Sequence, residues 1–355
     1  MTSSKDGAPQ SALEYPFSSK PALGETIEVA PGVLWIRMTL PFALNHINLW
    51  AIEDGEGWAV VDTGVQDSET SAAWRQIFAK SFGGRPVTRV FVTHMHPDHV
   101  GMAGWITRRF GCRLWITRGE YLTCRVLVAD TGREAPPEGT EFYRRAGWSE
   151  DQLETYRTRF GSFGKTVYAL PDSYRRLHDG EIIQIGRYRW EVVVGNGHSP
   201  EHACLVCHEA GLLISGDQVL PRISSNVSVF PTEPDADPLG DWLSSIERLR
   251  SRIGPDVLVL PAHNEPFKGL HKRLDQLERN HVDSLDRLEE ALAERARAID
   301  VFPALFARPI RGEDAQLVSM ATGESLAHLN RLLRAGRARF DLDASGVGWY
   351  SRNFT

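Results

Sequence analysis

Short apolar runs that end in turn residues recur through the first three quarters of the chain. A continuous apolar run of this length, bounded by glycine, proline or polar residues, is typical of a strand buried on both faces. Helices are predicted between the strands over residues 68–81 and in the segment that runs into Phe110. The pattern as a whole predicts an α/β fold. The expected strands are residues 32–38, 46–53, 58–62, 90–92, 192–194, 212–214 and 257–260.

Beyond residue 240 the apolar pattern becomes helical. Residues 241–253 predict an amphipathic helix, and a long helix with a narrow apolar stripe is predicted from about Gly269. We expect the stripe to pack on the core rather than form a subunit seam, with His281 as a core histidine. The stripe consists of Leu270, Leu274, Leu277, His281, Leu285, Leu288 and Leu292.

The most distinctive polar segment directly follows a predicted buried strand. His94, His96, Asp98 and His99 place four metal-binding side chains within six residues. Pro97 cannot continue the strand, so these side chains are expected on a loop at its C-terminal end, where several imidazoles can turn toward one point. This spacing predicts a metal site.

Three of the other apolar runs are also followed by a potential ligand. These ligands are His198 after residues 192–194, Asp217 after residues 212–214 and His263 after residues 257–260. Imidazole and carboxylate ligands that leave a position open for water are what a zinc hydrolase needs. Nitrogen and oxygen donors without a thiolate suit Zn²⁺, while Fe²⁺ and Mn²⁺ are also compatible.

Together with residues 57–64, which end in Asp62-Thr63-Gly64, these motifs resemble the metallo-β-lactamase superfamily. The resemblance covers about residues 27–267 and is to the hydrolase branch that holds two metals. It implies an α/β fold of four layers, αββα. It also implies two divalent ions per chain, most simply zinc.

The resemblance further implies the role of each residue. Asp217 would bridge the two metals together with a water or hydroxide. Asp62 is expected to accept a hydrogen bond that orients a ligand imidazole, and His202 to support the site rather than bind metal. The implied ligands are His94, His96 and His198 for one metal, and Asp98, His99 and His263 for the other.

A hydroxide shared by two divalent ions is a nucleophile near neutral pH, and Asp98 can both bind metal and orient it. Hydroxyacylglutathione hydrolases and lactamase-like endoribonucleases belong to the resembled branch. We therefore expect hydrolysis of a small carbonyl substrate, a thioester first and a lactone second. The alternatives are a phosphodiesterase or endoribonuclease and, as lesser options, an iron-dependent sulfur oxygenase, flavodiiron-type redox chemistry or a non-catalytic DNA-binding regulator.

The final segment predicts helices followed by a hairpin, similar to the winged-helix module of the endoribonuclease-type relatives. The segment has seven Arg and six Asp or Glu, so its net positive charge is too small to favour binding of nucleic-acid phosphates. We expect a structural module or an oligomer contact. The expected helices are residues 301–307, a region around 316–321 and 324–335, and the expected strands are 337–340 and 347–351.

The predicted organisation has three parts. Residues 1–25 are expected to be a flexible tail, residues 26–267 the catalytic domain, and residues 268–355 the long helix with the winged-helix-like domain. Within the catalytic domain, residues 117–177 form an insertion rich in aromatic and arginine side chains, which we expect to be a lid over the metals.

Composition adds a few limits. A net charge of −6 and a pI near 6.1 do not indicate a nucleic-acid or membrane-surface binder. Cys204 and Cys207 would point to opposite faces of a strand, which argues against a metal or redox role. With no membrane-length apolar run and no signal-like N-terminus, we expect a cytoplasmic enzyme that acts on a small molecule. The C-terminal region is the candidate homo-oligomer contact.

Overall fold

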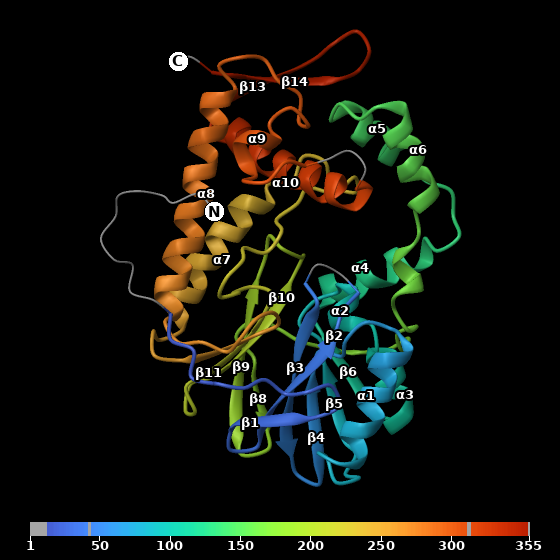
Figure 1. Ribbon diagram of the computed structural model, residues 1–355, viewed down its shortest axis with the longest axis vertical. Helices are drawn as coiled ribbons and strands as arrows, with labels where there is room; N and C mark the ends of the chain where they lie inside the picture. The colour runs from blue at the N-terminus through green and yellow to red at the C-terminus, as the bar shows by residue number, and fades with distance from the viewer. Residues whose placement is uncertain (1–12, 42–43, 311–313, 354–355) are drawn as a thin grey trace.

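Two β-sheets packed face to face form the centre of the fold, and helices cover both outer faces (Figure 1). The structure is a computed structural model that describes residues 13–41, 44–310 and 314–353. Within these ranges the strands form two mixed sheets and a small C-terminal hairpin. This arrangement confirms the predicted α/β fold with αββα layers and a small C-terminal domain.

The first sheet, in the order β1 to β7, is antiparallel from β1 to β4 and parallel from β4 to β7. In the β2–β3 register, Trp35 pairs with Trp50 and Arg37 pairs with Asn48. The strands are β1 (Thr26–Ala30), β2 (Val33–Thr39), β3 (His46–Asp54), β4 (Gly57–Val61), β5 (Val87–Phe91), β6 (Arg113–Ile116) and β7 (Arg175–Arg176).

The second sheet has the order β12-β11-β10-β9-β8, with only β11 and β12 parallel among its paired strands in the described ranges. Cys204 faces the core on the helix side and Cys207 faces the core between the sheets, as the alternation along a strand predicted. The strands are β8 (Ile182–Ile185), β9 (Tyr188–Gly195), β10 (His202–Cys207), β11 (Leu212–Gly216) and β12 (Leu258–Pro261).

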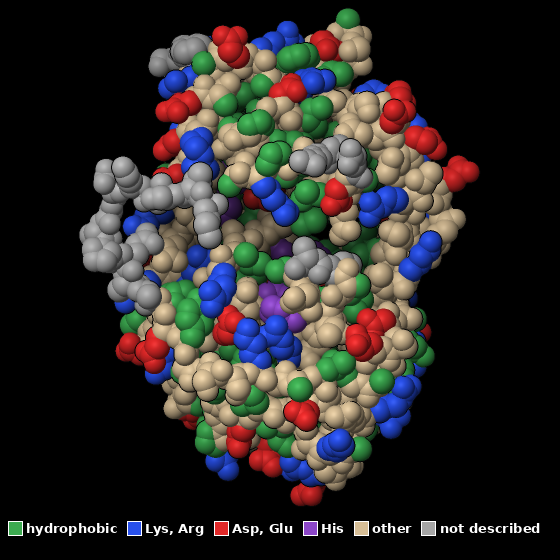
Figure 2. All heavy atoms as spheres, in the orientation of Figure 1, with side chains coloured by type: hydrophobic (Ala, Val, Ile, Leu, Met, Phe, Trp, Pro, Cys, Tyr) green, Lys and Arg blue, Asp and Glu red, His purple; other side chains and the backbone are tan. Residues whose placement is uncertain are grey.

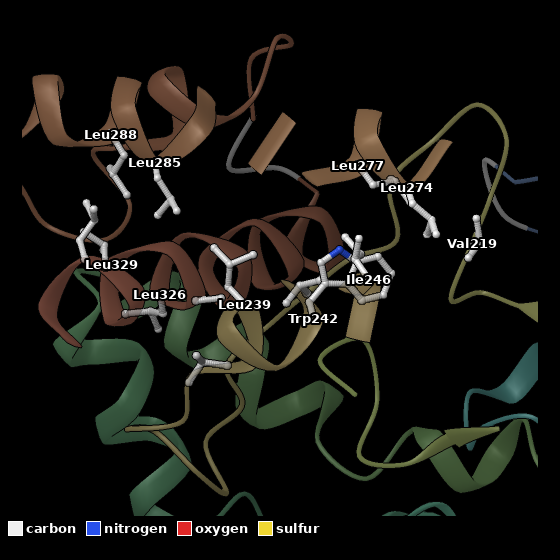
Figure 3. Packing of buried hydrophobic residues seen from close by; sticks show 14 of the residues in the cluster. Val219, Leu239, Trp242, Ile246, Leu274, Leu277, Leu285, Leu288, Leu326 and Leu329 are labelled. Carbon is white, nitrogen blue, oxygen red and sulfur yellow. The ribbon is translucent and has the colours of Figure 1, made fainter. Parts of the chain in front are cut away.

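Apolar side chains fill the spaces between the layers. Trp35, Trp50 and Trp190 lie between the two sheets, while α1 (Ser68–Ala79) and α3 (Ala103–Phe110) cover the first sheet. The second sheet is covered by α7 (Pro238–Arg252) and α8 (Leu270–Ala291), and α10 (Ala315–Arg334) packs on both helices. Leucines of α8 and α10 meet α7 in this core, as Figure 3 shows. The predicted packing of the α8 stripe on the core is confirmed.

The predicted insertion is helical and contacts the C-terminal domain. The Tyr143 hydroxyl lies 2.9 Å from Ser319 Oγ, and Trp148 Nε1 donates to Thr322 Oγ1 at 3.0 Å, so this segment packs against α10. Its helices are α4 (Arg118–Ala129), α5 (Pro137–Arg145), α6 (Glu150–Arg159) and η1 (Phe163–Lys165), and β7 lies at its end.

The C-terminal domain differs from the prediction in one respect. The two helical regions expected at residues 316–321 and 324–335 are a single helix, α10. Gly323 lies inside this helix. A Cβ at residue 323 would lie 2.8 Å from Ser228 Oγ, so the glycine permits Ser228 to pack closely against α10. The predicted hairpin is present, after the short helix α9 (Phe302–Leu305), as β13 (Ala338–Leu342) and β14 (Gly348–Arg352).

Part of the predicted N-terminal tail packs on the domain. Residues 1–12 lie outside the described residues, but Glu14 forms a backbone bridge with Lys268, and the Phe17 ring lies 6.0 Å from the Trp35 ring. The described part of residues 1–25 is therefore not free of the core. Among the described helices, none is both long and apolar enough to cross a membrane.

Candidate metal centre

The segments that follow β5, β9, β11 and β12 meet at one edge of the sandwich. The potential ligands identified in the sequence lie on these segments. Figure 2 shows histidine side chains inside a hollow on this face of the molecule. The chain therefore places the ligand-bearing segments where a small molecule can enter.

The first group of potential ligands is His94, His96, His198 and Asp217, each with one atom within 4.8 Å of the others. The His94 Nε2 atom lies 2.9 Å from His96 Nδ1 and 3.3 Å from His198 Nε2. Asp217 Oδ2 lies 3.4 Å from His198 Nε2. These four atoms converge on one point.

The second group lies beside the first and consists of Asp98, His99 and His263. Asp98 Oδ2 lies 3.5 Å from His263 Nε2 and 3.8 Å from His99 Nε2. The second oxygen of Asp217, Oδ1, lies 3.5 Å from His99 Nε2 and 3.4 Å from His263 Nε2. Asp217 therefore faces both groups with one oxygen toward each.

Each imidazole that enters a group through Nε2 has its Nδ1 atom hydrogen-bonded on the outer side. A neutral imidazole carries one ring hydrogen, so a donating Nδ1 leaves a lone pair on Nε2. The Nε2 atoms thus face one another and the carboxylates, an arrangement that suits a cation between them. The outer acceptors are Thr93 Oγ1 for His94 (3.1 Å), Asp62 Oδ2 for His99 (2.8 Å), the Asn226 carbonyl for His198 (2.7 Å) and the His46 carbonyl for His263 (2.9 Å).

Two inward-facing atoms are not satisfied by the polypeptide. His99 Nε2 and Asp217 Oδ1 are buried and have no hydrogen-bond partner among the residues that the structure describes. A buried polar atom without a partner is costly, and imidazole nitrogen with carboxylate oxygen is the donor set that Zn²⁺ and related ions take. The two groups therefore fit two adjacent divalent metal ions.

The protonation of the imidazoles differs between the groups. Burial, reinforced by neighbouring imidazoles, lowers the pKa of His94 well below its ordinary value, and burial beside His198 lowers the pKa of His96 to about 3. Burial also lowers the pKa of His99 and of His263, but nearby carboxylates outweigh it and raise both. The first group thus offers neutral ligands, while the second is an anionic pocket suited to positive charge.

The backbone of the first motif corrects one expectation. β5 ends at Phe91, and Pro97 begins a short helix, α2 (Pro97–Val100), so Asp98 and His99 lie on a helical turn rather than on a loop. Proline suits the first turn of a helix because its missing N–H would have no partner there. The helical turn directs both side chains toward the same centre.

Asp62 lies in the turn after β4 and contacts the segment that carries His94 and His99. It accepts hydrogen bonds from the Thr93 N–H, from Thr93 Oγ1 and from His99 Nδ1, each at 2.8 Å. Asp62 has a φ of 60°, in the left-handed region that is costly for a residue with a side chain. The three hydrogen bonds offset this strain and fix the orientation of the His99 ring.

His202 lies next to the first group without belonging to it. Its Nε2 atom accepts a hydrogen bond from the Asp217 N–H at 3.1 Å, and its ring stacks on His94 with 4.8 Å between centroids. A Cβ on Gly216 would lie 2.5 Å from that same Nε2 atom, so glycine is required at this point. In this position His202 holds the backbone of Asp217.

Glu120, at the start of α4, is a site residue that the sequence did not indicate. Its buried carboxylate accepts hydrogen bonds from the Met95 N–H (2.8 Å), Ser199 Oγ (2.6 Å) and the Glu201 N–H (2.8 Å). Burial raises the pKa of Glu120, although these three donors oppose the rise. Glu120 ties the turn that carries His94 to the turn that carries His198.

Asn226 connects the first group to the C-terminal domain. Its backbone carbonyl accepts the His198 Nδ1 hydrogen bond, and its side-chain Nδ2 donates to Glu324 of α10 at 2.9 Å. Burial raises the pKa of Glu324 to about 7, while the hydrogen bond from Asn226 lowers it. The orientation of His198 therefore depends on a loop that α10 holds in place.

Family models match both parts of the chain. The model described as "Metallo-beta-lactamase superfamily" matches residues 44–263, and the model described as "Metallo-beta-lactamase-like, C-terminal domain" matches residues 285–353. The second match places the C-terminal domain among those that accompany this catalytic fold.

Individual relatives agree with the models. The chain is 26% identical over 282 residues to human acyl-coenzyme A thioesterase MBLAC2, which covers 77% of this chain and 88% of the relative. It is 25% identical over 177 residues to hydroxyacylglutathione hydrolase GloC of Haemophilus influenzae, covering 49% and 67% of the two chains. The crystal structure of a beta-lactamase domain protein from Burkholderia ambifaria is 42% identical, with a TM-score of 0.88 over 96% of this chain and 98% of the other.

Proposed function

The chain belongs to the metallo-β-lactamase superfamily and is a metallo-hydrolase, and we propose that its substrates are small thioesters. The observation that carries the proposal is the pair of adjacent His/Asp groups. Asp217 belongs to the first group and has its second oxygen beside the other. Relatives named as an acyl-coenzyme A thioesterase and a hydroxyacylglutathione hydrolase support a thioester over other carbonyl substrates.

We assign the metal ligands from the two groups. Asp217 has one oxygen toward each group and is assigned as the bridging ligand. Bound divalent ions lower the pKa of water and stabilise negative charge that develops on a carbonyl oxygen. The remaining assigned ligands are His94, His96 and His198 for one ion, and Asp98, His99 and His263 for the other.

Asp98 is the residue that we assign to the reacting water. Its side chain is 18% exposed, compared with 0% for His99 and 2% for His263, so it faces the opening. Burial raises the pKa of Asp98, but the imidazoles of His99 and His263 outweigh burial and lower it. Asp98 is therefore ionised at neutral pH and accepts a hydrogen bond from the water, which orients the water toward the carbonyl carbon.

A thiol is the leaving group that suits this site best. Thiols have a pKa near 8.5, so a thiolate departs with little help from an acid, whereas an alkoxide or amine needs a proton. The imidazoles of both groups are assigned as metal ligands and are not free to supply that proton. The chemistry of the ligand set and the named relatives thus point to the same substrate class.

The test is elemental analysis of the purified protein combined with a turnover panel. The panel contains an acyl-coenzyme A, lactoylglutathione, a lactone, bis(p-nitrophenyl) phosphate and a short RNA. We expect two metal equivalents per chain and the highest kcat/KM with a thioester. Two equivalents with turnover confined to the phosphodiester or RNA would replace the proposal with a nuclease, and one equivalent of iron would contradict the two-metal assignment.

A further inference from the structure

Outside the assigned ligands, three cationic side chains gather around one carboxylate at the edge of the site. Glu265, two residues after His263, forms ion pairs with Lys20 Nζ at 2.5 Å and with Arg222 Nε at 3.2 Å. Arg37 is the third cation, and its guanidinium interacts electrostatically with Glu265. Three cations and one carboxylate leave a formal charge of about +2 at this point. Figure 2 shows Lys and Arg side chains beside the histidines in the hollow.

Arg37 stands on a face of the sheet where a cation is unusual. Trp35 and Trp50 form a pair on the inner face, and both are at most 1% exposed between the two sheets. Side chains two residues apart on a strand share a face, so Arg37 and its partner Asn48 continue this face beyond the tryptophans. The Arg37 guanidinium therefore lies at the border of the apolar core between the sheets.

The same face leads to the second metal group. Asn48 Nδ2 donates to the carbonyl of Asn264, the residue after His263, at 2.7 Å. His46 accepts the Asn264 N–H at 2.8 Å, and its ring lies 6.1 Å from the His263 ring. Arg37 pairs with Asn48, and His46 lies two residues before Asn48 on β3, so Arg37 and His46 are diagonal neighbours on the same face of the sheet. Arg37 therefore borders the turn that carries a ligand.

The guanidinium of Arg37 is not fully satisfied by the protein. Its Nη1 atom is buried and lacks a hydrogen-bond partner in the described part of the chain. Glu265 already pairs with Lys20 and Arg222, so it does not neutralise Arg37 as well. A partly buried arginine stays charged, and an oxyanion can accept two parallel hydrogen bonds from it.

We propose that Arg37, together with Lys20 and Arg222, binds a phosphate group on the thiol half of the substrate. This inference rests on the proposed thioesterase function and narrows it to thioesters of phosphorylated thiols. A phosphate monoester carries about −1.5 to −2 charges at neutral pH, which matches the local excess of positive charge better than one carboxylate does. The acyl carbonyl then lies over the metal groups while the phosphate stays at the rim.

The first experiment compares thioesters that share an acyl group and differ in the thiol. The substrates are acetyl-coenzyme A, S-acetylglutathione, which carries carboxylates, and S-acetyl-N-acetylcysteamine, which carries neither group. The variant is Arg37→Gln, with Arg37→Lys to restore the charge. The matched control is Arg85→Gln, because Arg85 is also partly exposed and pairs with a carboxylate, Glu53.

We expect the kcat/KM ratio of acetyl-coenzyme A to the cysteamine thioester to fall roughly tenfold to a hundredfold in Arg37→Gln, mainly through KM. Arg37→Lys should recover part of the ratio, and Arg85→Gln should leave it unchanged. An unchanged ratio in Arg37→Gln overturns the inference and leaves the thioesterase proposal intact. An equal loss of S-acetylglutathione selectivity would assign the subsite to carboxylates and overturn the choice of phosphate.

A second measurement does not depend on turnover. Calorimetry of inorganic phosphate with the zinc-loaded protein should give a dissociation constant about tenfold weaker for Arg37→Gln than for the wild type. Equal binding by both proteins, or binding by neither, overturns the inference. Since this result stands even when no thioester is hydrolysed, failure of the phosphate site is distinguishable from failure of the proposed function. Zinc content is measured in every variant.

Discussion

The metal centre and the leucine-rich core between α7, α8 and α10 both bury histidines, but different groups surround the rings in the two regions. In the core, His328 Nδ1 donates to the Glu324 carbonyl at 2.8 Å, and the His281 and His328 rings lie 3.4 Å apart at their nearest nitrogens. Burial lowers the pKa of His281 to about 3 and that of His328 to about 4, so both are neutral. The core satisfies its histidines with groups of the protein itself.

In the metal centre the imidazoles instead face two carboxylates, and Asp217 Oδ1 has no hydrogen-bond partner among the described residues. The difference shows that burial alone does not mark a histidine as a ligand. In both regions an Nδ1 atom donates to a backbone carbonyl, so what separates the metal centre is the presence of Asp98 and Asp217 beside the Nε2 atoms. Substitutions in each region should therefore fail in different ways.

The largest effect is expected for Asp217→Ala. This change removes the oxygens that face both groups, so metal content should fall to one equivalent or less per chain. Thioester turnover should drop roughly a thousandfold or more, because the two-metal site is then incomplete. Elemental analysis and kcat/KM measure the two effects. A variant that kept full metal and full activity would disprove the bridging assignment.

A core substitution should cost stability and leave the metals in place. Leu277 is 1% exposed and belongs to the α8 stripe, so Leu277→Ala should lower the free energy of unfolding by about 2–5 kcal/mol. Urea denaturation of the zinc-loaded protein measures this loss. Val282→Ala is the control on the same helix, because Val282 is 45% exposed and should cost little. Loss of zinc from the folded Leu277 variant would contradict the separation of the regions.

Glu324 lies where the two regions meet, and its effect should depend on pH. Burial raises the pKa of Glu324 to about 7, above the ordinary value for an unfolded chain. A raised carboxyl pKa gives stability that is present below the unfolded pKa and is lost as pH rises through 7. Glu324→Gln removes this dependence. The free energy of unfolding of the variant, relative to that of the wild type, should therefore rise by up to about 3 kcal/mol from pH 4 to pH 8. Denaturation at both pH values tests this, and a constant difference would refute it.

The smallest effect is expected for His202→Ala. This ring holds the Asp217 N–H without joining the metal group, so two metal equivalents should remain. Metal affinity should fall by about tenfold, as is usual when a residue that positions a ligand is removed. Competition with a chelator measures the affinity. Loss of one whole equivalent would instead make His202 a ligand.

The sequence predicted those features that depend on short, local patterns. Apolar runs marked the strands, and the residues that follow them lie at one edge because strands of a sheet end together. The α8 stripe was recognisable by its helical spacing, and its burial follows from that spacing. The family resemblance then assigned roles that spacing alone would have left open.

Other features depend on contacts between distant segments and carried no local signal. Glu120 lies on a helix that was expected to belong to a lid, and its role comes from turns around Met95 and Ser199. Arg37 is one polar position in a strand until the register places it beyond Trp35. Two helical regions were expected at 316–321 and 324–335, whereas the glycine between them lies inside one helix, where it permits the close approach of Ser228.

The hydrogen bonds of Asn226 have a thermodynamic consequence. If α10 helps to orient His198 through Asn226, then metal binding and the order of the C-terminal domain are linked, and linkage is reciprocal. Zinc should therefore slow amide hydrogen exchange in α10, a helix that supplies no ligand to the ion. The two domains would then share one cooperative unfolding transition when metal is bound and unfold less cooperatively when it is removed.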